Sequence, residues 1–261
     1  MSNRCASMNQ YEITLWTPGV HPFSSRYYLQ MSYREAVTDS VVHVYNRGVK
    51  KLDIFRDQRD LFRLMYSLYY FNTSHTMSPS WTRDVERSGG MHTSAWPEHW
   101  EPRTPLVSIL AFTIMQNHFH LVLKECIDGG ISKFMHRVGM GYSKFINEKY
   151  KESGSLFQGA YKSRRIDDDT DLQNLLVYTM IKNPFELYPG GLTQACKEFD
   201  QAYAHTLGYP LTSLAEFIGH TKPAILDHNL LREIGSDPNT FKESARDSML
   251  YRLEQMDSFD F

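Results

Sequence analysis

The stretch of sequence that says most about the fold is Ile114-Met115-Gln116-Asn117-His118-Phe119-His120-Leu121-Val122-Leu123. Its apolar residues favour a β-strand, in which successive side chains alternate between the two faces of a sheet. His118 and His120 then point to one face, while Phe119 and Leu121 point to the other. Two imidazoles side by side on a sheet face make half of a metal site.

Composition limits the class of protein. The 261 residues suit one domain with extensions or two small domains, and 41% hydrophobic with 13% aromatic residues are enough for a core. No apolar run approaches the roughly 20 residues that span a bilayer, and the first ten residues lack an apolar signal core. We therefore expect a cytoplasmic protein with no membrane partner. Three distant cysteines without a CxxC pair favour neither a zinc ribbon nor a disulfide framework.

Charge is uneven along the chain. The formal net charge of −2 argues mildly against nucleic-acid binding by the chain as a whole. Residues 131–165, however, hold eight lysines and arginines against two glutamates, and an acidic run follows at 167–171. A basic strip is what binding to a phosphate backbone requires. Taken alone, the strip is more simply explained as a solvated helix face.

The N-terminal half predicts alternating elements. Residues 1–37 show no clear period and are interpreted as an N-terminal extension. Residues 41–48 predict a strand, and residues 57–71 have the apolar spacing of a helix. Residues 72–105, rich in Ser, Thr, Pro, Gly and Trp, predict an irregular insertion. Residues 106–113 predict a strand that continues into the histidine-bearing strand or pairs with it.

The C-terminal half predicts a helix, a strand and further helices. Ser132 is expected to cap a helix that runs to about Glu152, and residues 156–166 predict a strand. A helix over 172–182 ends at Asn183-Pro184, and residues 192–261 are amphipathic and helical. This order predicts an α+β fold, an antiparallel sheet with helices packed on one face, whose other face stays open for a site.

Three sequence motifs occur in a fixed order in the second half of the predicted domain. The His-Phe-His triplet is followed by Gly154-Ser-Leu-Phe-Gln-Gly-Ala-Tyr-Lys-Ser163, and then by a helix that carries Tyr178 and ends at Asn183-Pro184. In this order and spacing the series resembles the single-tyrosine HUH transposases, the family of small insertion sequences and of REP-associated tyrosine transposases. The resemblance covers roughly residues 41–191. It implies a ferredoxin- or RRM-like HUH core at 38–191, followed by a helical C-terminal region whose role it does not give.

The resemblance also implies a chemistry. A family member is a DNA-cleaving and strand-joining enzyme whose partner is single-stranded DNA with a hairpin or palindromic element. A tyrosine attacks the scissile phosphate, keeps the 5′ end as a phosphotyrosine and leaves a free 3′-OH. Relatives work as monomers or homodimers, and a nucleoid-associated, cytoplasmic location is expected.

A metal ion fits this chemistry. A phenol has a pKa near 10 and is a poor nucleophile at neutral pH. A divalent ion held by His118 and His120 can polarise the phosphate and offset the charge that builds on its oxygens. Imidazole suits Mn²⁺, whereas Mg²⁺ usually prefers oxygen ligands, so the sequence leaves Mg²⁺ and Mn²⁺ open as the cofactor.

The helix that carries Tyr178 departs from the family pattern. Tyr178 is the expected nucleophile, with Tyr142 second, since the spacing of Tyr142 with apolar neighbours suggests packing. In many relatives the tyrosine lies four residues before the Asn, whereas here Asn183 lies five residues after Tyr178. Because Lys182 at the fourth position is a poor ligand, Asn183 is the candidate third metal ligand, and a π-bulge could absorb the extra residue.

Two other functions remain open at this point. A degenerate, domesticated member would bind structured nucleic acid without cutting it. A metal hydrolase would use the two histidines with water, which leaves the Tyr178 helix unexplained. In the leading interpretation, the phosphate contacts are six basic side chains: Arg47, Arg137, Lys144, Lys162, Arg164 and Arg165.

Overall fold

The structure of the protein is a computed structural model that describes residues 40–90, 95–220 and 225–257. The predicted extension over 1–37 lies outside these ranges. The described residues belong to one compact unit, Met31–Phe261. Among them, no helix combines the length and apolar character that crossing a bilayer requires.

A four-stranded antiparallel sheet forms the centre of this unit. Its strands are β1 (Val41–Arg47), β2 (Val107–Met115), β3 (His118–Glu125) and β4 (Lys162–Arg165). They lie in the order β2-β3-β1-β4, and every pairing is antiparallel. With α2 (Gln58–Tyr70) and α4 (Gly130–Tyr150) as the crossovers, the chain order is β-α-β-β-α-β, the ferredoxin-like arrangement. The predicted α+β class is confirmed.

The histidine-bearing run is divided between two strands. Ile114 and Met115 end β2, Gln116 and Asn117 make the turn, and β3 begins at His118. The pairing of Met115 with His118 closes a tight hairpin. A polar pair between two apolar runs favours such a turn, so the second strand pairs with the first and does not continue it.

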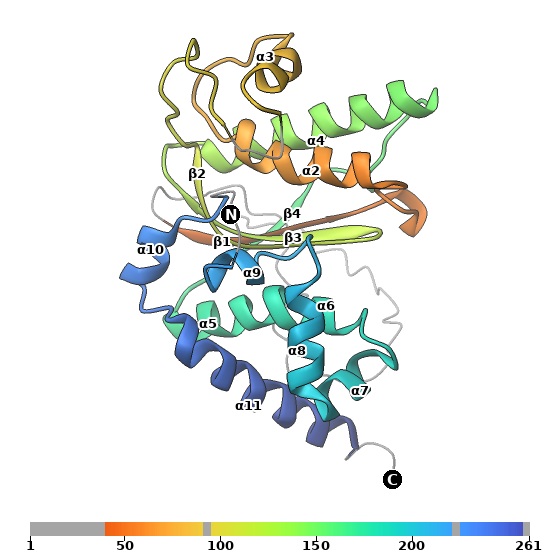
Figure 1. Cartoon of the computed structure of the whole chain (residues 1–261), viewed down its shortest axis with the longest axis vertical. Helices are drawn as coiled ribbons and strands as arrows, with labels where there is room; N and C mark the ends of the chain where they lie inside the picture. Colours follow the sequence, from red (N-terminus) through yellow and green to blue (C-terminus); the bar gives the residue numbers. More distant parts are fainter. Residues whose placement is uncertain (1–39, 91–94, 221–224, 258–261) are drawn as a thin grey trace, which may run out of the picture. The chain divides into compact units, whose positions relative to one another are not determined.

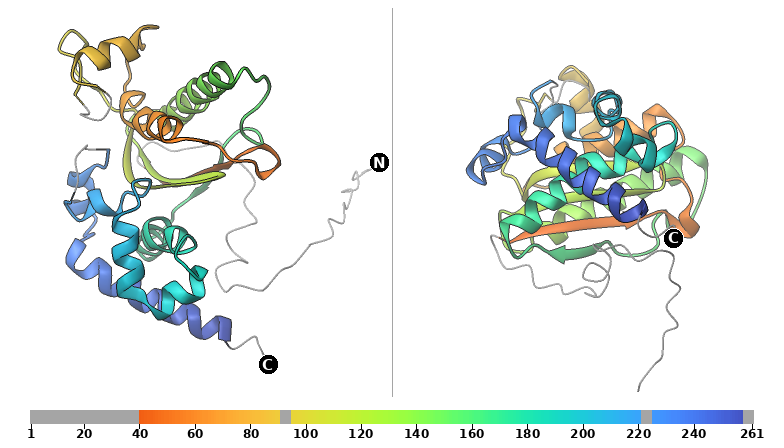
Figure 2. Two further views of the ribbon diagram at one scale, coloured as in Figure 1. Left: turned by 45° about the vertical axis from the view of Figure 1, so that its right-hand side comes forward. Right: turned by 90° about the horizontal axis from the view of Figure 1, so that it is seen from below.

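Helices α2 and α4 cover one face of the sheet, as Figure 1 and the left view of Figure 2 show. Phe119 and Leu121 of β3 are buried with Phe134 of α4 and Leu68 of α2 in the core. Helix α4 begins two residues before the predicted cap Ser132. Its N-cap is Gly129, whose φ of 67° suits glycine.

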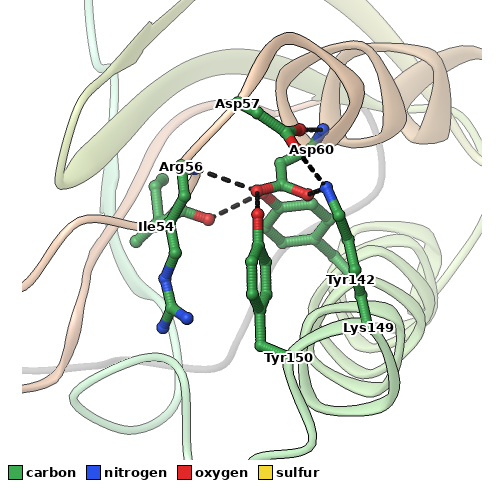
Figure 3. A network of polar contacts seen from close by, with 7 residues as sticks. All are labelled: Ile54, Arg56, Asp57, Asp60, Tyr142, Lys149 and Tyr150. Atoms are coloured by element: carbon green, nitrogen blue, oxygen red, sulfur yellow. Dashed lines mark hydrogen bonds and ion pairs between the residues drawn. The ribbon is translucent and has the colours of Figure 1, made fainter.

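A buried carboxylate ties α2 to the C-terminal end of α4 (Figure 3). Asp60, which is fully buried, accepts from the Arg56 backbone N–H at 2.9 Å, from Lys149 Nζ at 2.6 Å and from the Tyr150 hydroxyl at 2.7 Å. Beside it, the Tyr142 hydroxyl donates to the Ile54 carbonyl at 2.6 Å. The network fixes the loop before α2 against α4.

The opposite face of the sheet is covered too, which corrects the expectation that it stays open (Figure 1). A continuous helical segment crosses it, made of α5 (Asp169–Val177), the π-helical turn η3 (Tyr178–Lys182) and α6 (Asn183–Phe185). Met180 and Ile181 of η3 and Phe185 of α6 are fully buried. The polar residues of β1 and β3 on this face suggested that it was exposed. The helices that follow in the sequence instead pack against it and form a second core.

The remaining described elements are helical, and all but the last are short. They are η1 (Val49–Lys51), α3 (Trp81–Arg87), α7 (Gly191–Lys197), α8 (Phe199–Leu207), α9 (Leu214–Phe217), α10 (His228–Glu233) and α11 (Pro238–Asp257). Helix α3 lies in the segment predicted as irregular, where Trp81 packs edge-on against Phe71. Helices α7 to α11 bear out the helical character predicted for the C-terminal region.

Candidate active site

The register of the sheet gathers the polar residues of its second face. Tyr45 and Thr113 both pair with His120, and Arg47 pairs with His118. Directly paired residues of an antiparallel ladder share a face, so His118 and His120 project to one side, as predicted. This is the side that η3 covers.

His43 is a third histidine of this face, and sequence reasoning missed it. Its Nε2 lies 2.9 Å from His120 Nδ1, and the two rings stack with centroids 5.1 Å apart. Both side chains are buried. The signal was available, because strand alternation through residues 41–47 puts His43, Tyr45 and Arg47 on one face. The contact uses Nδ1 of His120, so Nε2 of His120 is the ring nitrogen that does not take part in it.

His118 is held in the same way by its neighbour. His118 Nδ1 lies 2.7 Å from Asn117 Oδ1, and Asn117 Nδ2 donates to the Lys51 carbonyl at 3.1 Å. Because the amide nitrogen is already assigned to a carbonyl, Oδ1 is the acceptor and His118 Nδ1 donates. In that tautomer the lone pair of His118 is on Nε2.

Burial keeps all three imidazoles neutral. Burial and the Arg164 charge lower the pKa of His43 to about 3. Burial, followed by the charge of Arg47, lowers the pKa of His118 to about 4. The pKa of His120 is well below its usual value, again mainly through burial and then through His43. Metal ions bind the neutral form of histidine, so the state at neutral pH suits a ligand role.

Of the two candidate nucleophiles, only Tyr178 lies beside the histidines. Its ring is half-buried and meets that of His120 edge-on, with centroids 5.4 Å apart, and that of His43 at 6.2 Å. Lys182 Nζ lies 5.1 Å from the Tyr178 ring centroid. Tyr142 is on α4, on the other side of the sheet, fully buried, and its hydroxyl donates to a backbone carbonyl. Its role is packing.

The extra residue between Tyr178 and Asn183 is absorbed by a π-turn, as predicted. The Asn183 backbone N–H donates to the Tyr178 carbonyl, five residues back, so the two residues are one wide turn apart. Asn183 is 1% exposed, and its Nδ2 is buried without a hydrogen-bond partner among the described residues. An orphaned buried amide nitrogen is unusual in a folded protein, and because it is a donor, an acceptor such as a phosphate oxygen could complete its bonding.

The donor set at this place fits a divalent ion only in part. Two neutral imidazoles and one amide are present, but within the ranges that the structure describes no three His, Cys, Asp or Glu side chains are grouped to hold a metal ion. A carbonyl or phosphate oxygen would have to complete the coordination.

The six basic residues predicted to bind DNA do not form one patch. Arg47, Lys162 and Arg164 share the histidine face through their register with His118, Tyr45 and His43. Arg164 is engaged with Asp171 at 2.6 and 3.0 Å. The guanidinium of Arg47 forms no ion pair with any residue in the described ranges, and its side chain is exposed.

The other three basic residues point elsewhere. Arg137 and Lys144 are on α4, on the far side of the sheet, where Arg137 donates to the Thr73 carbonyl and Lys144 lies 3.7 Å from Glu148. Arg165 alternates with Arg164 and so faces away from the histidines, 3.6 Å from Asp167. The site therefore has three of the six cations on its own face.

Comparison with known proteins supplies a family for part of the chain. Residues 104–180, which run from before β2 to Met180 of η3, match the family model described as "Transposase IS200 like". A solved structure described as "Structure of the REP associates tyrosine transposase bound to a REP hairpin" is 10% identical, with a TM-score of 0.45 over 76% of this chain and 98% of that chain. No match was found among curated proteins.

Proposed function

We propose that this chain, whose residues 104–180 match the IS200-like transposase model, belongs to that family and cleaves and rejoins single-stranded DNA beside hairpins through a phosphotyrosine at Tyr178. The observation that carries the proposal is the edge contact of Tyr178 with His120, at 5.4 Å between ring centroids. A nucleophile and the groups that stabilise its reaction must share one small space. The contact between Tyr178 and His120, both from one chain, supports the proposal on this ground.

The reaction exchanges one phosphoester for another. The Tyr178 oxygen attacks the phosphorus and forms a bond to it, while the bond from phosphorus to the 3′ oxygen breaks. The phenol loses its proton and the departing 3′ oxygen gains one, so the strand ends in a 3′-OH and the 5′ end stays on the protein. Attack by a 3′-OH on the phosphotyrosine reverses these bond changes: it releases the tyrosine and joins the two strands.

A divalent ion, Mg²⁺ or Mn²⁺, is part of the proposal. His118 and His120 would hold it through Nε2, since Nδ1 of each ring is engaged by Asn117 or His43, and Asn183 would contribute its amide oxygen. When bound, such an ion acts as a Lewis acid on the phosphate. His43 would orient the ring of His120, as partners of metal-bound histidines do.

The DNA strand would run along the cations of the histidine face. Arg47, beside His118 and without an ion-pair partner in the described ranges, is the proposed contact for the scissile region. Lys162 and Arg164 would follow along β4. Arg137, Lys144 and Arg165 would reach more distant parts of the hairpin, since they face away from the histidines.

The test is a covalent adduct. The protein is incubated with single-stranded hairpin DNA and Mn²⁺ or Mg²⁺, and protein–DNA adducts are separated under denaturing conditions. Tyr178→Phe should form none, whereas Tyr142→Phe should still form the adduct. An adduct that persists in Tyr178→Phe would show that the nucleophile is another residue.

A non-cutting binder of structured nucleic acid is the second candidate. The observation that favours it is that, in the described part of the chain, no three His, Cys, Asp or Glu side chains are arranged so that they could hold a metal ion. Such a protein would bind the hairpin with strong salt dependence and yield no adduct with either ion. A metal hydrolase would instead turn over DNA without any covalent intermediate.

A further inference from the structure

Residues 209–213 of the C-terminal region lie between β2 and the turn that carries the proposed nucleophile. This segment runs along β2: the Ile114 N–H donates to the Leu211 carbonyl at 2.8 Å, and the Ser213 N–H donates to the Phe112 carbonyl at 2.9 Å. It thereby forms an isolated antiparallel bridge between Thr113 and Thr212. The segment lies beyond residues 104–180, the part that matches the family model.

Two buried hydroxyls meet at this bridge. Thr113 Oγ1 and Thr212 Oγ1 lie 3.2 Å apart. The Thr113 hydroxyl donates to the Thr179 carbonyl of η3, and the Thr212 hydroxyl lies 3.4 Å from the Met180 carbonyl. The two threonines are 0% and 4% exposed, so no bulk water competes for these carbonyls.

The Thr179 carbonyl is the one that the π-turn releases. In a regular α-helix the Thr179 carbonyl would accept from the Asn183 N–H, but that N–H donates to Tyr178 instead. The Met180 carbonyl does not distinguish the two geometries in this way, because its donor in the regular helix would be residue 184, a proline without an N–H. A buried carbonyl without a partner is costly, so the Thr113 hydroxyl stabilises the wide turn against the regular one. The Thr212 hydroxyl supports it from 3.2 Å away.

We propose that Thr113 and Thr212 are positioning residues that hold η3 in its π form and so aim Tyr178 at the histidines. Thr113 is suited to this because it pairs directly with His120 on the sheet. One side chain thus links the strand next to the histidine with the turn that begins at Tyr178. The inference rests on the proposed function for its consequence in cleavage.

Loss of the π-turn would change the geometry of the site. One residue corresponds to about 100° of rotation around a helix axis. A turn that relaxed to regular α geometry would therefore displace Tyr178 and Asn183 relative to one another around the axis. Misplacement by about 1 Å can cost on the order of 100-fold in rate.

The experiment compares isosteric and conservative variants. Thr113→Val and Thr212→Val remove a hydroxyl with little change of shape, and Thr113→Ser keeps it. Thr206→Val is the matched control, because Thr206 Oγ1 is buried with no hydrogen-bond partner among the described residues. For each variant we would measure amide hydrogen exchange at Asn183, the single-turnover rate of adduct formation and the affinity for hairpin DNA.

The expected result separates positioning from general stability. Thr113→Val should speed exchange of the Asn183 amide and slow adduct formation by about 10- to 100-fold, with unchanged hairpin affinity. Thr113→Ser should restore both values, and Thr206→Val should match the wild type. Equal effects of Thr113→Val and Thr206→Val, or no change at the Asn183 amide, would overturn the inference.

The two proposals fail in different ways. If the wild type forms no adduct, the proposed function is wrong, while exchange at the Asn183 amide still decides whether the threonines hold the π-turn. If Thr113→Val does not fold, Thr212→Val decides: it should accelerate exchange at Asn183 without changing exchange in α4, and a protein-wide acceleration would contradict a positioning role.

Discussion

Two buried polar clusters lie on opposite faces of one sheet and differ in how completely their groups are bonded. On the face of α2 and α4, the Asp60 carboxylate accepts three hydrogen bonds, and its partners come from the loop before α2 and from the end of α4 (Figure 3). On the other face, Asn183 Nδ2 and Thr179 Oγ1 are buried with no partner in the described part of the chain.

The difference predicts that mutation of the two clusters will change different properties of the protein. A fully satisfied buried network rigidifies the fold, whereas unsatisfied buried groups cost stability and persist where function requires them. The Asp60 cluster should therefore respond to mutation through the free energy of unfolding. The histidine–tyrosine cluster should respond through binding and rate.

The largest effect on stability is expected from Asp60→Asn. The substitution removes the charge that faces Lys149 and leaves the Tyr150 hydroxyl with a weaker acceptor, which should lower the free energy of unfolding by about 3 kcal/mol. Denaturant unfolding measures it. Glu152→Gln is the control, since its ion pair with Arg56 is about half exposed and should matter little. If Asp60→Asn had the same free energy of unfolding as the wild type, the Asp60 cluster would not be the stabilising one.

Substitution of His43 should change the affinity for a metal ion. His43→Leu removes the partner of His120 Nδ1, and loss of such an outer partner typically costs about 10- to 100-fold in metal affinity. Titration calorimetry with Mn²⁺ in the absence of DNA measures it. His43→Gln, which can still accept a hydrogen bond, should recover much of the loss. Equal losses in the two variants would assign His43 a packing role only.

Acid should weaken the histidine face of the metal-free protein. The pKa of His43 is about 3 when folded, against an ordinary value of 6.5, so between these values the unfolded chain binds the extra proton. The stability from the neutral ring is complete above pH 6.5 and falls as the pH decreases. The expected loss is about 2 kcal/mol by pH 5. His43→Gln should remove this contribution and leave those of His118 and His120, measured as the free energy of unfolding against pH.

Sequence reasoning reached the parts of this site that depend on local patterns. Strand alternation put His118 and His120 on one face, and the five-residue offset between Tyr178 and Asn183 suggested the π-turn. The ferredoxin-like order followed from the resemblance and from the alternation of elements. These features depend on residues near each other in the chain or on a motif.

The features that were missed depend on residues far apart in the chain. His43 meets His120 across 77 positions, and Thr212 meets Thr113 across 99. Strand alternation gives the face of His43 within β1, but no periodicity gives its contact with His120, which exists only once β1 is placed in the sheet. The same holds for Thr212 and the 209–213 segment. The covered second face has the same origin, since it depends on helices that follow the motif.

The smallest effect contrasts single cations on the two faces. Arg47→Ala should weaken hairpin binding several-fold and reduce the slope of log affinity against log salt by about 1, because one phosphate contact is lost. Lys144→Ala, on α4 and 3.7 Å from Glu148, should change both values less. Binding measured over a series of salt concentrations tests the pair. Equal slopes of log affinity against log salt for the two variants would mean that the DNA also contacts α4. Both faces of the sheet would then bind DNA, and they would differ only in their contribution to stability.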